Sequence, residues 1–459
     1  MFSKRFLSGA ALTALSISMG GAAYAQSTAS QITEDEVVVT GARRTVDGAI
    51  SAESGAKARS TITQAFIEQQ TPGQTILEQI NLIPGVSFSN NDAYGTSGGE
   101  LNIRGFDSAR ISLTFDGIQL NDTGNYAIYS NQQLDPELIA RANVNLGSTD
   151  VDSPTASATG GTVNYVTRTP SDDFGVMLNA TGGSNEYRRV FALLDSGKIG
   201  PWDTSLFGAV SDQTYNQFVG PGTLTKHQYN LRVYQPIGSG ADFVSVAVHF
   251  NQNRNDFYRR VNLLQFNAGT ANSVVYDGSC TFTTNQCSNY RGVNINPSDT
   301  GNVRIQSRFD ITPNLTFTLD PSYQYVLADG GGTFTFAEND ARLIGTAAPA
   351  VASRSVNASC ATITGPQGVD LNGDCDTNDS SIRVYEPNIT NTHRFMVLSS
   401  LLWDISSTNH LRFGYTWDHG NHRQTGEMTL LNSQGEPLDV FGAKGGRAEA
   451  IPTLDGNIL

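Results

Sequence analysis

Residues 244–250 read Val-Ser-Val-Ala-Val-His-Phe, so that every second position carries a large apolar side chain. Successive side chains of a strand point to opposite faces, and this alternation therefore predicts a strand with one apolar and one polar face. The same alternation recurs in residues 315–320 and 411–418. Because an antiparallel sandwich and a membrane barrel both alternate in this way, the pattern alone leaves the two architectures open.

The lengths of the connections between such strands favour the barrel. We predict nine strands, at residues 174–183, 187–199, 203–214, 225–236, 241–254, 301–312, 315–327, 390–405 and 409–420. The connections 255–300 and 328–389 are long, whereas those at 238–240 and 313–314 are tight turns. The first connection, at 184–186, is also short. Tight turns at one rim and long loops at the other are typical of a transmembrane β-barrel.

The composition excludes several classes of protein. The chain has 459 residues, enough for a sizeable core, and 46 of them are glycine, which suits turn-rich β structure. Charged residues make up only 16%, and the formal net charge of −14 argues against a sequence-independent grip on nucleic acid. Four cysteines are too few to form a disulfide framework for a chain of this length.

The first 25 residues are interpreted as a secretory signal peptide. Lys4 and Arg5 precede an apolar stretch that ends in the small-residue pattern Ala23-Tyr24-Ala25, after which we expect cleavage. No later window holds 18 consecutive apolar residues. A membrane crossing by the mature chain would therefore need a closed barrel of strands.

Three zones follow the signal peptide. Residues 26–50 form a polar tail that contains one β-branched island, and residues 51–170 are predicted to form a compact α+β unit. Within this unit we predict helices at 63–70 and 74–82 and short strands further along. Residues 171–459 carry the alternating strands described above.

Five short stretches resemble the TonB-dependent outer-membrane receptors in order and spacing. They are Glu36-Val37-Val38-Val39-Thr40-Gly41, Ile83-Pro84-Gly85-Val86, Leu101-Asn102-Ile103-Arg104-Gly105-Phe106, Asp116-Gly117-Ile118 and Gly160-Gly161-Thr162-Val163-Asn164-Tyr165-Val166-Thr167. The resemblance implies a mainly β protein of the bacterial outer membrane. Its fold would be a transmembrane antiparallel β-barrel, here incomplete, with an N-terminal α+β plug domain at 51–170.

The resemblance also implies roles for single residues. Residues 36–40 resemble the TonB box, an extended segment that adds a strand to a sheet of the partner TonB. Arg104 would pair with carboxylates inside the barrel, and Gly160 would close the plug in a turn that needs glycine. The predicted TonB-binding residues are Glu36, Val37, Val38, Val39 and Thr40, and the predicted plug-motif residues are Arg104, Gly105, Asp116, Gly117, Gly160 and Gly161.

Two departures from the family pattern stand out. Residues 143–147, Asn-Val-Asn-Leu-Gly, lack the acidic residue and the arginine that the family usually shows before a glycine, so the usual ionic contact there is in doubt. The nine predicted strands also fall well short of the 22 in a family barrel. We therefore expect the chain to be an N-terminal fragment of a longer reading frame or a truncated product.

The expected function is uptake of a scarce ligand by TonB-energised transport. A ferric siderophore is the cargo expected from the family, and the polar turns at the plug apex (90–94, 107–110 and 121–129) are the expected ligand contacts. The candidate ligand-binding residues are Asn91, Tyr94, Arg110, Asn125, Tyr126 and Tyr129. The segment 26–34 is too short to hold an added signalling domain.

Two alternatives remain open from the sequence. One is a secreted or surface β-sandwich that binds carbohydrate or acts as an adhesin, and the other is the same receptor fold importing a carbohydrate or another nutrient. We expect no enzyme activity and no cofactor. Residues 95–99 match the nucleophile-elbow pattern in letters only, because a strand and not a helix is predicted to follow them.

The cysteines and acidic residues of the long loops give two further predictions. Export favours local disulfides between Cys280 and Cys287 and between Cys360 and Cys375. Residues 370–381 alternate oxygen-bearing side chains as a calcium loop does, but its sixth and twelfth positions do not fit, which favours a solvated acidic loop. His419 and His422 are three apart, and we interpret them as exposed polar residues, so no metal site is predicted.

Overall fold

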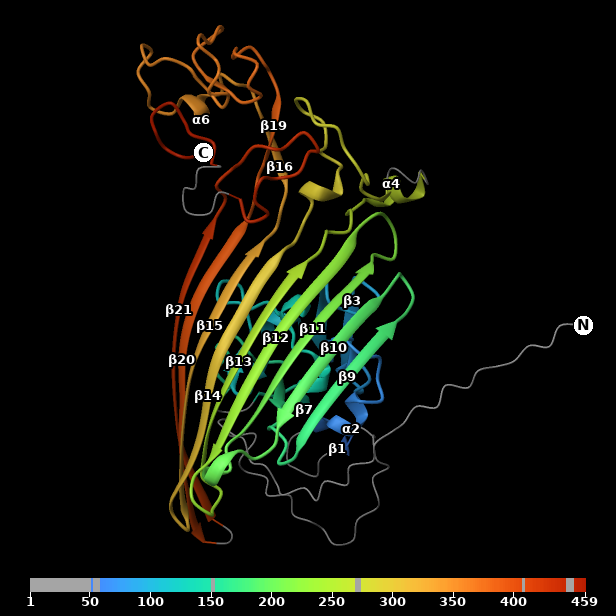
Figure 1. The fold of residues 1–459 in the computed structure, drawn as a ribbon, viewed down its shortest axis with the longest axis vertical. Coiled ribbons are helices and arrows are strands. Elements are labelled where there is room, and N and C mark those ends of the chain that lie inside the picture. The colour runs from blue at the N-terminus through green and yellow to red at the C-terminus, as the bar shows by residue number, and fades with distance from the viewer. Residues whose placement is uncertain (1–50, 53–57, 150–152, 269–273, 407–408, 443–449) are drawn as a thin grey trace, which may run out of the picture.

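The computed structural model describes residues 51–459 except 53–57, 150–152, 269–273, 407–408 and 443–449. Figure 1 shows a small domain lying inside the curve of one large sheet, with long loops gathered above the sheet. The predicted signal peptide and the predicted TonB box lie outside the described residues.

The small domain, which we call the plug, is built on a six-stranded mixed sheet. The strand order is β1-β2-β7-β8-β5-β6, with β5 and β8 parallel and the other pairs antiparallel. These strands are β1 (Ser51–Ala52), β2 (Arg59–Thr63), β5 (Ile111–Phe115), β6 (Ile118–Gln119), β7 (Ile139–Leu146) and β8 (Gly161–Thr167). A separate hairpin consists of β3 (Val86–Asn90) and β4 (Gly99–Ile103).

The plug helices are shorter than the sequence predicted. They are α2 (Gln64–Ile67), α3 (Ile76–Ile80) and the 3₁₀ turns η1 (Ser108–Arg110), η2 (Ser130–Gln132) and η3 (Pro136–Leu138). The backbone after Ile80 continues only as a turn toward Pro84-Gly85, where proline cannot extend a helix. Helices this short are held by packing and not by their own propensity.

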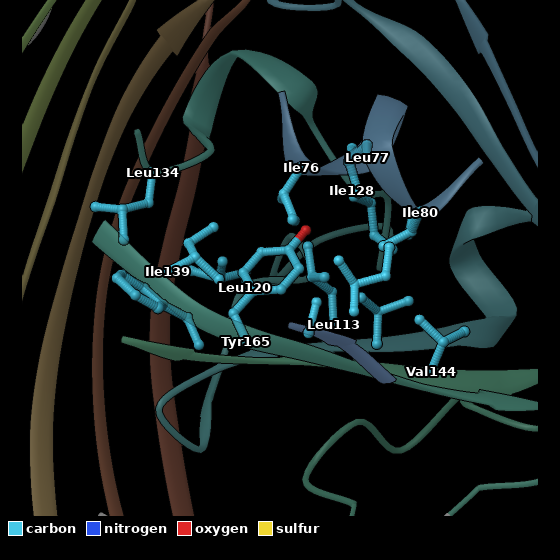
Figure 2. Packing of buried hydrophobic residues seen from close by; sticks show 14 of the residues in the cluster. Ile76, Leu77, Ile80, Leu113, Leu120, Ile128, Leu134, Ile139, Val144 and Tyr165 are labelled. Atoms are coloured by element: carbon cyan, nitrogen blue, oxygen red, sulfur yellow. The ribbon is translucent and has the colours of Figure 1, made fainter. Parts of the chain in front are cut away.

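The core of the plug is continuous with the wall around it. Figure 2 shows Ile76, Leu77 and Ile80 of α3 pointing toward Leu113 and Tyr165 of the plug sheet. The same buried cluster includes six side chains from the inner face of the large sheet: Phe191, Leu193, Phe207, Ala209, Met396 and Leu398. Apolar burial therefore holds the plug against the wall as well as holding the plug itself together.

The large sheet, which we call the wall, has nine antiparallel strands in chain order. They are β9 (Phe174–Gly182), β10 (Arg188–Ser196), β11 (Ser205–Asn216), β12 (Thr223–Pro236), β13 (Phe243–Arg254), β14 (Ser298–Thr312), β15 (Leu315–Asp329), β20 (Ile389–Ser406) and β21 (Asn409–Thr425). The nine predicted strands are confirmed. The sandwich alternative is wrong, because these strands form one sheet and not two facing sheets. Its outer strands β9 and β21 are not neighbours, so the sheet is not closed within the described residues.

The two faces of the wall differ as the alternation predicts. Val248 of β13 stands in register with Leu231 of β12 and Val303 of β14, and these three outward side chains are 38–44% exposed. The next residue, His249, points inward and is buried. The outer face is therefore apolar, whereas the inner face is mainly polar and carries the six apolar side chains that pack on the plug core.

Short and long connections separate at the two rims of the wall. The turn rim carries 197–204, with η4 (Gly200–Trp202), and the tight connections 237–242 and 313–314. The loop rim carries 255–297, 330–388 and the segment after β21, which Figure 1 shows together at the top. None of the helices in the described parts of the chain has the length and apolar character needed to cross a bilayer.

The substitution Val248→Arg tests whether the outer face of the wall meets lipid. A guanidinium placed there near the middle of a bilayer should destabilise the folded sheet by about 2–4 kcal/mol, because lipid offers it no water. The measurement is the urea midpoint of folding into phospholipid vesicles. Val351→Arg in a loop-rim connection, where Val351 is 38% exposed, should leave the midpoint unchanged. Equal midpoints for the two variants would show that Val248 does not face lipid.

Candidate functional site

The plug turn at residues 121–129 is exposed toward the loop rim and built by its own side chains. Asn121 is buried, accepts a hydrogen bond from the Leu113 amide (2.8 Å) and donates to the carbonyl oxygens of Ile111 and Tyr126. The Asp122 carboxylate accepts from the amides of Gly124 and Asn125. These bonds fix the turn, so its remaining side chains have a defined direction.

Three predicted ligand contacts lie together on this turn. Asn125 is exposed and donates to the Tyr129 hydroxyl at 3.3 Å, while Tyr126 is half-buried with a φ of 61°. Tyr129 is 39% exposed. A tyrosine hydroxyl is protonated at neutral pH and can donate a hydrogen bond, and burial of the rest of the ring raises the pKa of Tyr129 further.

The three other predicted contacts are placed differently. Tyr94 is buried, because its ring stacks on Tyr187 of the wall with centroids 3.8 Å apart. It is therefore a plug–wall contact and not an open ligand contact. Asn91 beside it is exposed. Arg110 is exposed at the end of η1, where its carbonyl oxygen accepts from the Gly160 amide (2.8 Å), and no hydrogen bond within the described residues joins it to the 121–129 turn.

The 90–98 turn is tied to the wall through Asp92. This carboxylate is fully buried and accepts from the amides of Tyr94 and Ser97 and from the hydroxyl of Tyr215 on β11. Tyr215 also bonds to Thr96 of the same turn. A movement of this turn would therefore have to break contacts with β11.

The 121–129 turn fits against β20 and β21 of the wall. A Cβ added at Gly420 would lie 2.6 Å from Cγ2 of Thr123, and one added at Gly124 would lie 2.6 Å from Nε2 of His422. The two glycines permit this close approach. Arg394 of β20 donates to the carbonyl oxygen of Asn121 at 3.0 Å. Neither Arg394 nor Gly420 was predicted as a contact of the plug.

The histidines of β21 do not form a pair. His422 faces the plug and its Nδ1 lies 2.8 Å from the Thr392 hydroxyl oxygen, whereas His419 stacks on Trp417. Positions three apart on a strand lie on opposite faces. Among the residues that the structure describes, no group of three or more histidine, cysteine or acidic side chains could hold a metal ion.

The predicted plug-motif residues occupy backbone positions that favour glycine. Gly105 and Gly117 have φ values of 83° and 88°, and a Cβ on Gly161 would lie 2.5 Å from the carbonyl oxygen of Asn145. Gly160 packs against Phe106 in the same way. Arg104 itself is exposed and lies beside Gly147. The expected ion pair between Arg104 and a wall carboxylate is absent from the described residues.

The ion pairs between plug and wall run in the opposite direction, from plug acids to wall arginines. Asp116 of the plug is fully buried, and its Oδ2 lies 3.2 Å from Nε of Arg304 on β14 and 3.9 Å from the guanidinium of Arg232 on β12. The same carboxylate accepts from the amide and hydroxyl of Thr167. Asp116, predicted only as a motif residue, is therefore the centre of a buried charge cluster.

A second cluster joins the plug to β10. Arg189 donates to Glu137 at 2.6 Å and to Asp135 at 3.1 Å, and its side chain is fully buried. Burial raises the pKa of Glu137, against the opposing effect of Arg189. Lys226 of β12 donates to the carbonyl oxygen of Gln133 nearby. The sequence signal for these contacts was the placement of Arg189, Lys226, Arg232 and Arg304 at inward positions of predicted strands.

The connections at the loop rim form one body, which we call the loop cap (described parts of 255–297, 330–388 and 426–459). Its elements are α4 (Leu263–Asn267), η5 (Arg291–Val293), β16 (Thr333–Phe336), α6 (Ala341–Ile344), β17 (Arg354–Ser355), β18 (Val369–Asp370) and β19 (Ile382–Tyr385). Disulfides join Cys280 to Cys287 and Cys360 to Cys375. Backbone bonds from Phe282 to Ser433 and from Arg383 to Thr284 connect the three segments.

The acidic loop of the cap satisfies its oxygens internally. Asp370 accepts from the amides of Gly373 and Cys375, and Asp376 accepts from the amide of Asn378. Glu338 is fully buried beneath this loop and accepts from the amides of Leu371 and Asp379. Burial raises the pKa of Glu338 to about 7. This carboxyl therefore changes charge near neutral pH.

Comparisons with known proteins agree with this geometry. The family profile described as "TonB-dependent Receptor Plug Domain" matches residues 51–162. No curated protein matches the sequence. The fold is similar to that of the ferric-catecholate import receptor Fiu from E. coli K12, in its closed form, with a TM-score of 0.55 and 17% sequence identity over 86% of this chain and 52% of that chain.

Two further solved structures are similar to this chain in fold. The P. aeruginosa receptor FpvA, in complex with an iron-loaded heterologous pyoverdine, gives a TM-score of 0.54 at 13% identity, over 86% of this chain and 46% of that chain. BauA, the ferric preacinetobactin receptor from Acinetobacter baumannii, gives 0.53 at 13% identity, over 84% and 50%. The chain thus spans about half the length of each of these receptors.

The substitution Arg189→Met tests the cluster on β10. It leaves Asp135 and Glu137 buried without their cation and should weaken the attachment of the plug by about 3 kcal/mol or more. The measurement is the urea midpoint of plug release. Release is detected by maleimide labelling of an Ala209→Cys reporter on the inner face of the wall. Arg188→Met is the matched control, because Arg188 is exposed on the opposite face of the same strand. Equal midpoints for the two variants would contradict the assignment.

The substitution Glu338→Gln tests the buried carboxyl of the cap. The folded-state pKa of about 7 lies above the ordinary value near 4.5, so the contribution of Glu338 to the stability of the cap is fully present below pH 4.5 and is lost as the pH rises through 7. Hydrogen-exchange protection of the Leu371 and Asp379 amides, corrected for intrinsic rates, should fall over that interval. In Glu338→Gln this fall should disappear, whereas Glu436→Gln, at an exposed carboxyl of the cap, should keep it.

Proposed function

We propose that the chain is a TonB-dependent receptor of the bacterial outer membrane and that it takes up a scarce ligand by energised active transport. The observation that carries this proposal is the placement of the plug. It fills the curve of the wall, is held there by buried ion pairs, and exposes the 121–129 turn toward the loop rim. Such a plug blocks free diffusion and allows passage only when it moves.

We propose a ferric siderophore as the ligand. The named relatives are receptors for ferric catecholate, pyoverdine and ferric preacinetobactin, and their likeness to this chain is a likeness of fold. The exposed hydroxyl of Tyr129 and the amide of Asn125 are hydrogen-bond donors for an oxygen-rich chelate. A carbohydrate would also use such donors, so the experiment below includes one.

The proposed energy source is the partner TonB, which would engage residues 36–40. The sequence Glu-Val-Val-Val-Thr is β-branched and can add as a strand to a sheet edge, where main-chain hydrogen bonds provide affinity. A pull on this segment would act on the plug and break its contacts with Arg189 and Arg304. Because the family consists of receptors and transporters, we propose no catalytic step.

Uptake by the complete gene product tests this function. The host is a bacterial strain that has an outer membrane but lacks its own siderophore receptors. Expression of the protein in this strain should restore ⁵⁵Fe uptake from ferric catecholate or hydroxamate probes, and only when TonB is present. Val38→Pro should abolish uptake, because proline cannot donate in a strand ladder. Ser30→Pro, in the same tail but outside the predicted TonB box, should leave uptake unchanged.

Each other outcome of this experiment has a defined meaning. Uptake of radiolabelled maltodextrin without uptake of iron would replace the siderophore by a carbohydrate but keep the transport mechanism. Uptake of either probe in the absence of TonB would contradict energised transport. Equal uptake by Val38→Pro and the parent protein would remove residues 36–40 from the mechanism.

A further inference from the structure

Asp320 is a buried acid of the wall that the contacts described above do not use. It lies on β15, is 3% exposed, and its Oδ1 accepts from the Ser307 amide at 2.8 Å. Its Oδ2 has no hydrogen-bond partner in the described residues. A buried carboxylate oxygen without a partner is costly, and its presence calls for an explanation.

The charge cluster beside Asp320 has an excess of cations. Arg232 and Arg304 are both buried in the wall and share the single plug carboxylate of Asp116. Asp320 is close enough to Asp116 for the two carboxylates to interact electrostatically. Asp320 is thus a second acid near this cluster, and no ion pair within the described residues joins it to either arginine in the resting state.

The two arginines depend on the plug to different degrees. Arg232 donates to two wall side chains, Ser245 at 2.9 Å and Gln306 at 2.6 Å, and would keep these bonds without the plug. It also donates to the Thr167 hydroxyl at 2.6 Å and to the carbonyl oxygen of Arg168 at 3.2 Å, at the end of plug strand β8, and these bonds would break on withdrawal. Within the described residues, Arg304 donates to one wall side chain, that of Asn302. Its other contacts are plug groups: the Asp116 carboxylate and the ring of Phe115, whose centroid lies 3.8 Å from the guanidinium carbon. Withdrawal of the plug would thus leave Arg232 with two wall side-chain partners and Arg304 with one, among the residues that the structure describes.

Asp320 lies within reach of Arg304. Arg304 stands in register with Ser322 of β15, and Asp320 is the next residue on the same face of that strand. Diagonal neighbours on adjacent strands are about 7–8 Å apart at the backbone, a distance that an arginine side chain spans easily. In the resting state the attraction of Asp116 and the stacking on Phe115 keep the guanidinium turned toward the plug.

We propose that Asp320 is a positioning residue that accepts Arg304 when the plug and its Asp116 withdraw. The unpaired Oδ2 is the vacant acceptor, and the exchange of one carboxylate for another keeps the wall arginine paired in both states. The inference rests on the proposed function only in that the plug must move. No bond other than hydrogen bonds and the ion pair is made or broken.

The test measures plug withdrawal directly, with neither ligand nor TonB present. The complete protein carries Ala209→Cys, a wall residue covered by the plug, and is labelled with a water-soluble maleimide in a fixed urea concentration below the unfolding of the wall. The native cysteines are joined in disulfides. When closing is faster than labelling, the labelling rate reports the population of the withdrawn state.

Asp320→Asn should slow labelling about threefold, because the withdrawn state loses an ion pair in a wet lumen. In an Arg304→Gln background, Asp320→Asn should have no effect, since no arginine is left to accept. Asp299→Asn is the matched control, an aspartate paired with Arg254 on the wall, and it should label at the parent rate.

Three results would overturn the proposal. Faster labelling of Asp320→Asn would mean that Asp320 holds the plug in place, which is what a merely structural role predicts. An unchanged rate would mean that Asp320 does not contribute to the withdrawn state. An effect that persists in Arg304→Gln would assign it to another partner. Because no ligand or TonB takes part, none of these results depends on whether the chain transports a siderophore.

Discussion

The structure depends on one constraint: a sheet that meets lipid on its outer face turns its polar side chains inward, where its buried charges need partners. Val248, Leu231 and Val303 are partners on adjacent strands and point outward, and their neighbours along each strand point into the lumen. An unsatisfied polar group in that position is costly, and a charge is more so. The plug supplies the partners, with Asp116 for Arg304 and with Asp135 and Glu137 for Arg189.

The fold was largely predictable from the sequence, because its signals are local. A period of two fixes the faces of each wall strand, and tight turns such as 313–314 fix where strands reverse. The plug was predictable from its motifs, since positions such as Gly105 and Gly117 need glycine for their backbone angles. Helix lengths were overestimated, because the pattern around 74–82 shows which side chains are buried but not where tertiary packing ends the helix.

The candidate site was less predictable, because it is made of contacts between segments far apart in the chain. Arg104 was expected to pair with a wall carboxylate, but the inward positions of β10, β12 and β14 carry arginines and the plug carries the acids. In the sequence, Tyr94 and Tyr129 have the same signal, an aromatic residue in a polar turn. Only the structure separates them, since Tyr187 and Tyr215 of the wall cover the first and leave the second exposed.

The two charge clusters hold the plug unequally. Both carboxylates that contact Arg189 belong to the plug. Withdrawal of the plug on the β10 side therefore removes both ion pairs of this fully buried guanidinium. On the β14 side the wall itself contains Asp320, with a free oxygen on the face that carries Arg304. Breaking a buried ion pair costs most when one partner stays uncompensated. The plug should therefore separate first along β12–β15 and remain longest at β10, which places the opening beside Asp116.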